Sequence, residues 1–303
     1  MIRHIAHAGI DKRAWDRMLL DCTNRIWYAQ SWVLDIASPG WEALVDAERG
    51  ALMPLTHRRR YGIDYLFQPY ALQQLGPFAP QVDQALCDEF VAAVPRRFAY
   101  WDIWLNEAVR ITPGRGIRLV EHADQALMLD VDAEALRGGY SQGHRRNLRR
   151  PVPGSIVFGP DASAAEFVEL FIRTTGARFG GIPKRDAMML EQLIGKGIER
   201  GECSVPCVRS SGAVIAAICF AQWEGRSILL KSASDELGQT HRAAFRLIDR
   251  HIARLAGTGL LLDFAGSNNP SAARFNAGFG AASRVYLRLV RNRLPPPLRW
   301  FKR

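Results

Sequence analysis

The stretch Arg226–Tyr286 constrains the fold more than any other part of the chain. It combines a strand-like run (Ser227–Lys231), a polar loop, a long helix, a second strand (Leu260–Phe264), a short helix and a third strand. Apolar residues recur along the long helix at the 3.6-residue period, which predicts that one face is buried. Thr240 is placed as its N-cap, so free N–H groups and the positive end of the helix dipole would face the loop. The sequence therefore predicts an anion site at this loop.

The opposite side of the same helix is basic. It carries four arginines spaced four residues apart, namely Arg242, Arg246, Arg250 and Arg254. Like charges at this spacing cost a few tenths of a kcal/mol per pair, roughly, in helix stability. A solvated face is the simpler explanation, and a surface that meets an anionic ligand or partner is the alternative.

The charge of the whole chain favours anionic partners. The net charge is +10 and the pI is near 9.8, which suits nucleotide phosphates, RNA or an acidic membrane surface. The five cysteines are dispersed and odd in number, so we expect reduced thiols in the cytoplasm and no metal site. No signal peptide is predicted, and the longest apolar run, Ala213–Ala221, is nine residues, about half a membrane span.

The order of elements divides the chain into two related halves. Residues 41–105 read as strand-strand-strand-helix-strand, and the second half repeats this order before adding a helix and a strand. The glycine-rich break Thr112–Gly116 separates them. We expect an α/β (α+β) protein with domains over 1–115 and 116–290 and a basic, proline-rich tail over 291–303, which docks on the protein or lies on an anionic membrane.

Several catalytic motifs are missing from the sequence. It has no P-loop, no G-x-G-x-x-G after a strand, no H-E-x-x-H, no G-x-S-x-G and no paired C-x-x-C. Their absence argues against the common phosphoryl-transfer, hydride-transfer, metallopeptidase and serine-hydrolase classes. The run Tyr140–Arg150 is strongly basic, and it fits either a solvated helix face or a clamp for a phosphate or substrate.

Four short segments resemble those of a known family. They are Leu262-Asp-Phe-Ala-Gly-Ser267, Ala273-Arg-Phe-Asn-Ala-Gly-Phe-Gly-Ala281, the basic run Tyr140–Arg149, and Gln73-Gln-Leu-Gly76. With the order of elements, they make the chain similar to GNAT acyltransferases, and more specifically to the double-GNAT proteins of the FemAB-like kind. The resemblance implies two tandem domains, each with a mixed, largely antiparallel sheet flanked by helices.

The resemblance also implies an activity. It suggests an N-acyltransferase that moves an acyl group from acyl-CoA to a small-molecule or cell-envelope-precursor amine. The alternatives are aminoacyl-tRNA-dependent transfer to a peptidoglycan precursor or lipid amine, and a non-catalytic RNA- or lipid-binding protein with a degenerate GNAT fold. The transfer itself needs a neutral amine, N–H groups for the oxyanion and amides for the carrier phosphates, but no metal.

The family pattern assigns roles to particular residues. For binding the donor it gives Lys231, Ser232, Ser234, Thr240 and Arg242. For catalysis it gives Asp263 and Asn276, and His241 is added because its place at the expected helix N-terminus would let it serve as a base. For binding the substrate it gives Tyr70, Gln73, Gln74, Tyr140, Arg145, Arg146, Arg149 and Ser267.

Two of these positions depart from the family pattern, and one has a structural alternative. Arg242 stands where the CoA-binding loop of GNAT enzymes has glycine, and Asn276 stands where the tRNA-using members have lysine. Asp263 could cap the turn that follows its strand instead of binding substrate. The aromatic residues Phe275 and Phe279 are expected in the core.

Overall fold

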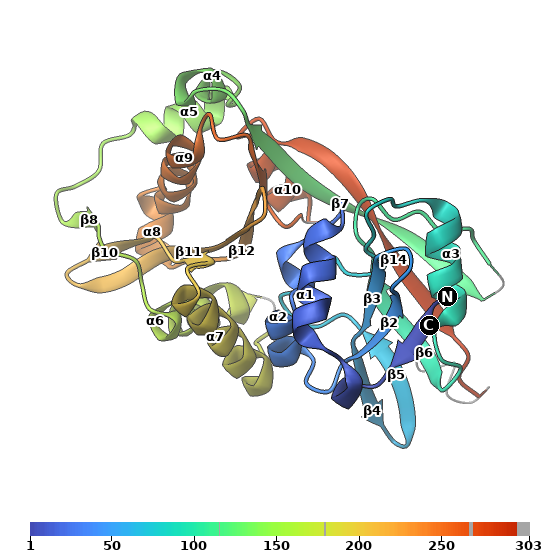
Figure 1. Ribbon diagram of the computed structural model, residues 1–303. Helices are drawn as coiled ribbons and strands as arrows, with labels where there is room; N and C mark the ends of the chain where they lie inside the picture. The colour runs from blue at the N-terminus through green and yellow to red at the C-terminus, as the bar shows by residue number, and fades with distance from the viewer. Residues whose placement is uncertain (115, 179, 267–268, 296–303) are drawn as a thin grey trace. The chain divides into compact units, whose positions relative to one another are not determined.

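The computed structural model describes residues 1–114, 116–178, 180–266 and 269–295 (Figure 1). Two compact units make up the chain, one formed by Met1–His122 with Val285–Arg303 and the other by Ala123–Arg284. The chain leaves the first unit within strand β7 (Ile117–Leu129) and returns to it within strand β14 (Ala282–Asn292). The predicted class, mixed and largely antiparallel sheets flanked by helices, is confirmed.

The first unit contains a small sheet and a larger one. The small sheet has the antiparallel order β1-β2-β3, and the larger sheet runs β4-β5-β6-β14, with β5 and β6 parallel. The strands are β1 (Arg3–Ile5), β2 (Glu42–Asp46), β3 (Ala51–Leu55), β4 (His57–Arg60), β5 (Ile63–Phe67) and β6 (Phe98–Trp104). The helices are α1 (Lys12–Asp21), α2 (Ser31–Ala37) and α3 (Gln84–Ala93), with short turns η1 (His7–Gly9) and η2 (Trp27–Ala29).

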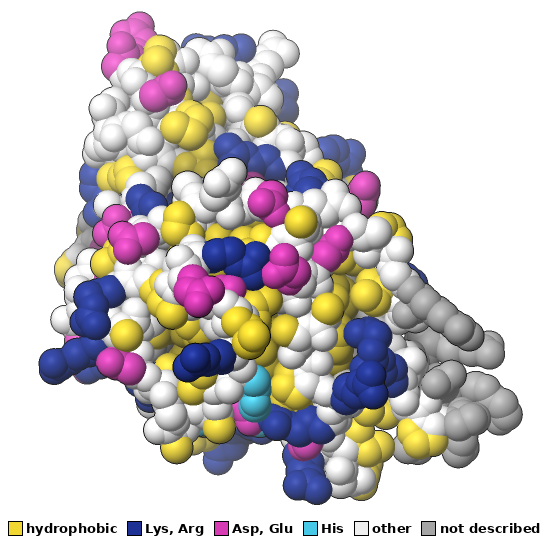
Figure 2. Space-filling model, turned by 45° about the vertical axis from the view of Figure 1, so that its right-hand side comes forward, with side chains coloured by type: hydrophobic (Ala, Val, Ile, Leu, Met, Phe, Trp, Pro, Cys, Tyr) yellow, Lys and Arg dark blue, Asp and Glu magenta, His cyan; other side chains and the backbone are white. Residues whose placement is uncertain are grey.

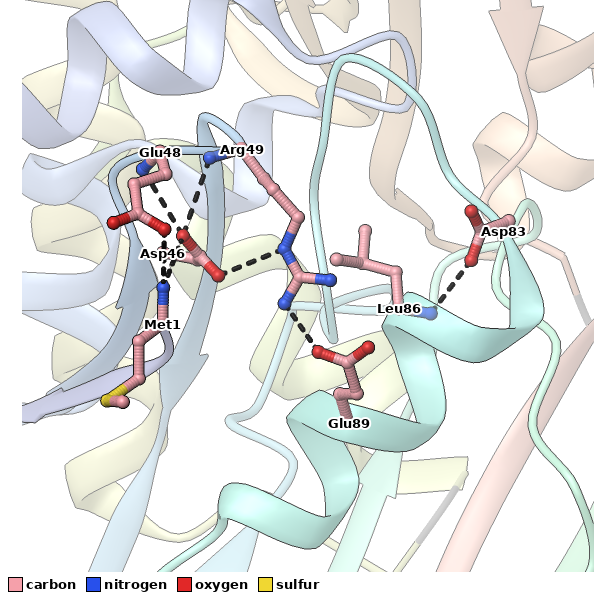
Figure 3. A network of polar contacts seen from close by, with 7 residues as sticks. All are labelled: Met1, Asp46, Glu48, Arg49, Asp83, Leu86 and Glu89. Carbon is pink, nitrogen blue, oxygen red and sulfur yellow. Dashed lines mark hydrogen bonds and ion pairs between the residues drawn. The ribbon is translucent and has the colours of Figure 1, made fainter.

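Polar contacts connect the turn after β2 to helix α3 (Figure 3). Arg49 donates to Asp46 over 2.9 Å and to Glu89 of α3 over 2.6 Å. Asp83 caps α3 by accepting from the Leu86 amide over 2.8 Å. Arg49 and Glu89 are solvent-exposed, so we expect their ion pair to add little stability. The buried side chains of α3, such as Phe90, should contribute more.

The second unit is built on one sheet with the order β7-β13-β12-β11-β10-β8, and β9 pairs with β11. The remaining strands are β8 (Ile156–Phe158), β9 (Cys203–Ser204), β10 (Cys207–Ser210), β11 (Ala213–Trp223), β12 (Arg226–Ser234) and β13 (Leu260–Asp263). The helices are α4 (Ala133–Gly138), α5 (Gln142–Arg149), α6 (Ala164–Phe171), α7 (Lys184–Glu199), α8 (Glu236–Thr240), α9 (Ala243–Leu255) and α10 (Pro270–Ala277), with the π-helical turn η3 (Ile172–Gly176). Strands β12 and β13 pair in parallel.

Strand β11 is the centre of this unit because both of its faces are covered. Eight consecutive residues of β11 are buried, and α9 and α6 both pack against it, on opposite faces (Figure 1). Ile218 and Phe220 of β11 share one core cluster with Leu247 and Ile252 of α9. The apolar face predicted for the long helix is therefore the face that α9 buries. The predicted capping box of Ser163 at the start of α6 is confirmed.

The predicted N-cap of the long helix is wrong. Thr240 is the last residue of the preceding helix α8, where its hydroxyl donates to the Glu236 carbonyl over 2.8 Å. Asp235 is the residue that caps, and it caps α8 by accepting from the Gly238 amide over 2.9 Å. Helix α9 starts at Ala243, after a left-handed residue that separates the two helices. Asp235 is a favourable N-cap and Glu236 follows it in the first turn, so a helix already begins before Thr240.

We expect Gly278→Ala to destabilise the second unit. A methyl group at Gly278 would overlap the ring of His144, which is buried and fixed by Ser141 and by the Phe275 carbonyl. Overpacking of this kind typically costs about 1–3 kcal/mol. Chemical denaturation measures the change in the free energy of unfolding.

Gly143→Ala is the matched control. The nearest atom to its added methyl group is Ser141 Oγ, 3.9 Å away. Helix propensity alone should then raise stability by up to about 1 kcal/mol. Equal effects of the two substitutions would contradict the close contact between Gly278 and His144.

Candidate functional site

Strands β12 and β13 stay paired over only three residues. Arg226–Ile228 pair with Leu261–Asp263, and the amide of Phe264 then donates to the Gln125 carbonyl on β7 over 2.9 Å. The rest of β12, residues 229–234, has no strand partner on the β13 side within the part of the chain that the structure describes. Two parallel strands that diverge in this way leave backbone N–H and C=O groups available to a ligand.

Asp263 fixes the point at which the strands separate. Its fully buried carboxylate accepts from Arg226 Nη1 over 3.1 Å and from the Ala265 amide over 2.7 Å. Ala265 has a φ of 50°, and Gly266 then passes so close to the Ala123 carbonyl that a side chain there would collide with it. These contacts turn the chain away from β12. Asp263 therefore caps the turn after its strand, as its structural alternative predicted. Its catalytic assignment stays a prediction.

A β-bulge interrupts β12 directly after the divergence. Lys231 pairs with Cys219 of β11 and Leu229 pairs with Phe220, so Leu230 has no residue opposite it. Bulges leave one residue outside the ladder and recur next to active sites. A backbone N–H released from a ladder can donate to a carbonyl oxygen that gains negative charge during a reaction. The sequence carries no signal for this bulge, because each residue here is an ordinary strand former.

Lys231 follows the bulge and has a perturbed pKa. Its side chain retains some contact with solvent, but protein atoms surround the ammonium group, and this burial lowers its pKa from 10.5 to about 8. A lysine with such a pKa is partly neutral near pH 8 and can accept a proton. The sequence placed Lys231 at the donor site but gave no indication of its burial.

Beyond β12, backbone amides at the start of α9 remain free. The N–H groups of Ala243, Ala244 and Phe245 have no hydrogen-bond acceptor among the described residues. Arg242 precedes them, at a position where glycine was expected. Its φ of 56° is the left-handed conformation that glycine favours. Free amides at the N-terminus of a 13-residue helix attract phosphate or carboxylate groups.

Two arginines add positive charge at the same end of α9. Arg242 donates to the Gln239 carbonyl over 3.1 Å, and Arg246 donates to the Arg150 carbonyl. Both acceptors are neutral, and the Nε atom of each arginine is buried with no acceptor among the described residues. Their charges are therefore not compensated by a carboxylate, which favours an anionic ligand.

The other residues predicted to bind the donor lie around this segment. Ser232 is exposed, and its carbonyl accepts from Thr175 Oγ1 of η3 over 3.0 Å. Ser234 accepts at its carbonyl from Gln239 Nε2 over 3.0 Å. His241, predicted to be catalytic, is the C-cap that follows α8 and is half-buried next to Arg242. The structure thus places the residues predicted to bind the donor along β12, at the end of α8 and at the start of α9.

Helix α5 presents the predicted basic clamp. Arg145, Arg146 and Arg149 are exposed and line a hollow of about 660 Å³, and α5 packs beside α9. Tyr140 is different, because it is buried in the core against Phe279 and its hydroxyl donates to Asp249 over 3.2 Å. The three arginines are accessible to a substrate, whereas Tyr140 packs as a core residue.

The remaining predicted residues make buried structural contacts. In the second unit, Asn276 donates to Gln125 Oε1 over 3.1 Å. In the first unit, Gln73 donates to the Tyr286 hydroxyl over 3.2 Å, and Gln74 accepts from the Glu107 amide over 2.9 Å. Tyr70 is half-buried in the same loop. Ser267 and tail residues 296–303 lie outside the described residues.

On one face of the molecule the charged side chains are dispersed. On the face seen in Figure 2, Lys and Arg side chains form several separate groups, with Asp, Glu and apolar side chains between them. Among the described residues, no three His, Cys, Asp or Glu side chains are grouped as metal ligands. No helix in the described ranges has the length and hydrophobicity that crossing a membrane requires.

Comparisons with known proteins agree with this geometry. Residues 137–271 match the family described as acetyltransferase (GNAT) domain. Among solved structures, FemX superposes with a TM-score of 0.61 at 11% identity, covering 99% of both chains. A tandem GNAT protein from the clavulanic acid biosynthesis pathway gives a TM-score of 0.54 at 14% identity, covering 96% of this chain and 98% of that one.

A third solved structure has a similar fold. It is the C-terminal domain of an Agrobacterium fabrum protein named as a lysylphosphatidylglycerol synthetase, with a TM-score of 0.53, 13% identity and coverage of 93% and 91%. No protein with a curated description matches the chain. The expected double-GNAT, FemAB-like resemblance is confirmed by the match of residues 137–271 and by the tandem folds of these neighbours. Residues 137–271 thus match the GNAT acetyltransferase domain, and the chain as a whole shares the fold of FemX and of the tandem GNAT protein.

Proposed function

We propose that the chain is an N-acyltransferase that takes its acyl group from acyl-CoA and transfers it to an amine. The observation that supports this donor is the unpaired part of β12. It begins at the bulge near Leu230 and leads, through α8, to the free amides of Ala243–Phe245. Acyl-CoA carries a thioester at one end of a flexible arm and a diphosphate at the other. The bulge suits the thioester and the start of α9 suits the diphosphate.

The chemistry follows from these positions. A neutral amine attacks the thioester carbonyl, a carbon–nitrogen bond forms, and the carbon–sulfur bond breaks to release the CoA thiolate. The N–H freed at the bulge donates to the oxyanion of the tetrahedral intermediate. Neutral Lys231 accepts the proton that the attacking amine loses, directly or through water. The site needs only to hold the thioester and the amine in a reactive orientation.

We expect acetyl-CoA or a longer acyl-CoA to stabilise the protein. At a concentration about one hundred times the dissociation constant, a ligand of the folded state contributes about 2.7 kcal/mol. Arg242→Gln with Arg246→Gln should weaken the affinity about tenfold or more, because hydrogen bonds to charged groups are lost. Thermal shift and isothermal titration calorimetry measure both effects.

The matched control is Arg13→Gln with Arg17→Gln. These two arginines are also four residues apart and exposed on a helix, but they lie on α1 in the first unit. The control removes the same charge and should bind acyl-CoA normally. If no acyl-CoA binds the wild-type protein, the proposed donor is wrong.

A second candidate donor is aminoacyl-tRNA, which the hollow on α5 favours. Three exposed arginines around about 660 Å³ can contact a phosphate backbone. The Agrobacterium neighbour also has a name that joins an aminoacyl group to a lipid. In that case the acceptor would be a lipid amine or a cell-envelope precursor.

For this donor, we expect tRNA binding that weakens steeply with salt. Arg145→Gln with Arg149→Gln should reduce the slope of log K against log salt by about two, since each phosphate contact contributes about one. Filter binding at several salt concentrations gives the slope. A slope that the substitutions leave unchanged would place tRNA elsewhere or exclude it.

Lys231 should make stability depend on pH. Its pKa is about 8 in the folded protein and 10.5 in the unfolded chain, so the unfolded chain binds more protons between these values. The free energy of unfolding should therefore rise with pH from about 8 to about 10.5 on account of this residue. Lys231→Met should remove that rise, and Lys184→Met, at an exposed lysine, should keep it. Denaturant titrations at several pH values measure the change.

The same substitution tests the catalytic assignment. If Lys231 accepts the proton, the acyl-transfer rate of the wild-type protein rises through about pH 8, and Lys231→Met lacks this limb. A stability effect without a change in the pH–rate profile would leave Lys231 a buried residue with no part in proton transfer.

A further inference from the structure

The second unit contains a cavity that the acyl-transfer site does not use. It has a volume of about 320 Å³ and lies between the last turns of α9, the segment after β8 and the start of β10. Arg250 and Arg254 contribute the charged part of its lining, and Phe158, Leu247 and Cys207 contribute the apolar part. Arg254 is 11 residues beyond Ala243, about 16 Å along the helix axis. The cavity is therefore separate from the free amides at the start of α9.

Both arginines are held in place by neutral groups. Arg254 Nη2 lies 3.1 Å from His251 Nδ1, and the guanidinium of Arg250 lies 4.6 Å from the ring centre of Phe158. Neither arginine forms an ion pair with a described carboxylate. By contrast, Arg137, earlier in the same unit, donates to Asp249 at 2.8 Å. Arginines that are oriented but not neutralised are prepared to bind an oxyanion.

The wall beside Arg254 is rigid and uncharged. His251 is buried, stacks on Phe220 with ring centres 3.6 Å apart, and shares a hydrogen bond of 2.8 Å between its Nε2 and Ser227 Oγ. Burial, reinforced by the charge of Arg254, lowers the pKa of His251 to about 3, so its ring is neutral at physiological pH. Its unprotonated Nδ1 accepts from Arg254, and Nε2–H donates to Ser227. The imidazole orients the arginine without adding charge to the cavity.

The net charge of the lining is positive. The two arginines oppose one carboxylate, Asp161, which is exposed and accepts from the Val205 amide over 3.0 Å. Burial raises the pKa of the Cys207 thiol, which donates to the Pro160 carbonyl, so this cysteine adds an apolar contact and no thiolate. A volume of about 320 Å³ lies at the lower end of the range for small-molecule sites.

We infer that this cavity binds a small oxyanion, a phosphate or a carboxylate, on a compact apolar body. The oxyanion is placed against Arg250 and Arg254, and the body lies on Phe158 and Leu247. The binding is independent of the acyl donor, because the two sites use different residues of α9.

Binding of phenyl phosphate and benzoate to the full chain tests the inference. Isothermal titration calorimetry of the wild-type protein should show one site for each probe, and the neutral analogue benzyl alcohol should bind more weakly or not at all. Arg250→Gln with Arg254→Gln should lower the affinity for phenyl phosphate about tenfold or more, because two charged hydrogen-bond donors are lost. Glutamine keeps part of the side-chain stem, so the fold should persist.

The control is again Arg13→Gln with Arg17→Gln, which removes the same charge from an exposed helix face of the first unit. It should bind phenyl phosphate as the wild-type protein does. Saturating acetyl-CoA should leave the affinity for phenyl phosphate unchanged. Absence of binding to the wild-type protein, equal losses in both double variants, or competition by acetyl-CoA would each overturn the inference.

Discussion

The buried carboxylate of Asp263 determines where the central strands of the second unit stop pairing. It accepts hydrogen bonds from Arg226 on the neighbouring strand and from the amide of Ala265, so it joins β12 and β13 and holds the turn that leads the chain away from β12. Removing one partner from such a buried pair typically costs about 3–5 kcal/mol, because the other charge is left without compensation. Beyond this point Phe264 pairs with β7, and residues 229–234 of β12 have no strand partner on the β13 side among the described residues.

The four arginines along helix α9 form one regular row in the sequence but lie in two different environments in the structure. Arg242 and Arg246 donate to backbone carbonyls near the N-terminus, where the free amides lie. Arg250 and Arg254 are held by an aromatic ring and an imidazole at the other end. The four arginines are evenly spaced in the sequence, but their tertiary contacts separate them into two pairs with different surroundings. The simpler explanation of a solvated face does not account for the buried Nε atoms of the first two arginines.

Sequence patterns predicted the main strands and helices of the second unit, whereas the donor-site residues that they suggested stay a prediction. Periodicity identified α9, and the run from β12 to β13 identified the strands on either side of it. The start of α9 was placed too early because Thr240 belongs to a short helix that Asp235 caps. The bulge at Leu230 and the burial of Lys231 depend on neighbouring strands, which local patterns do not contain. Tyr140 was assigned to the substrate as the first residue of the family-like run Tyr140–Arg149, but its ring packs against Phe279 in the core.

The return of β14 to the first unit determines the order in which the two units can fold while the chain is being synthesised. Strand β6 pairs with β14, and Arg288 holds Asp102 through two hydrogen bonds of 2.7 Å. The first unit therefore lacks a sheet neighbour until almost the whole chain has emerged, whereas the second unit is one continuous segment. During translation the edge of β6 stays open, a state in which strands associate with wrong partners. The half that is made first is the half that is finished last.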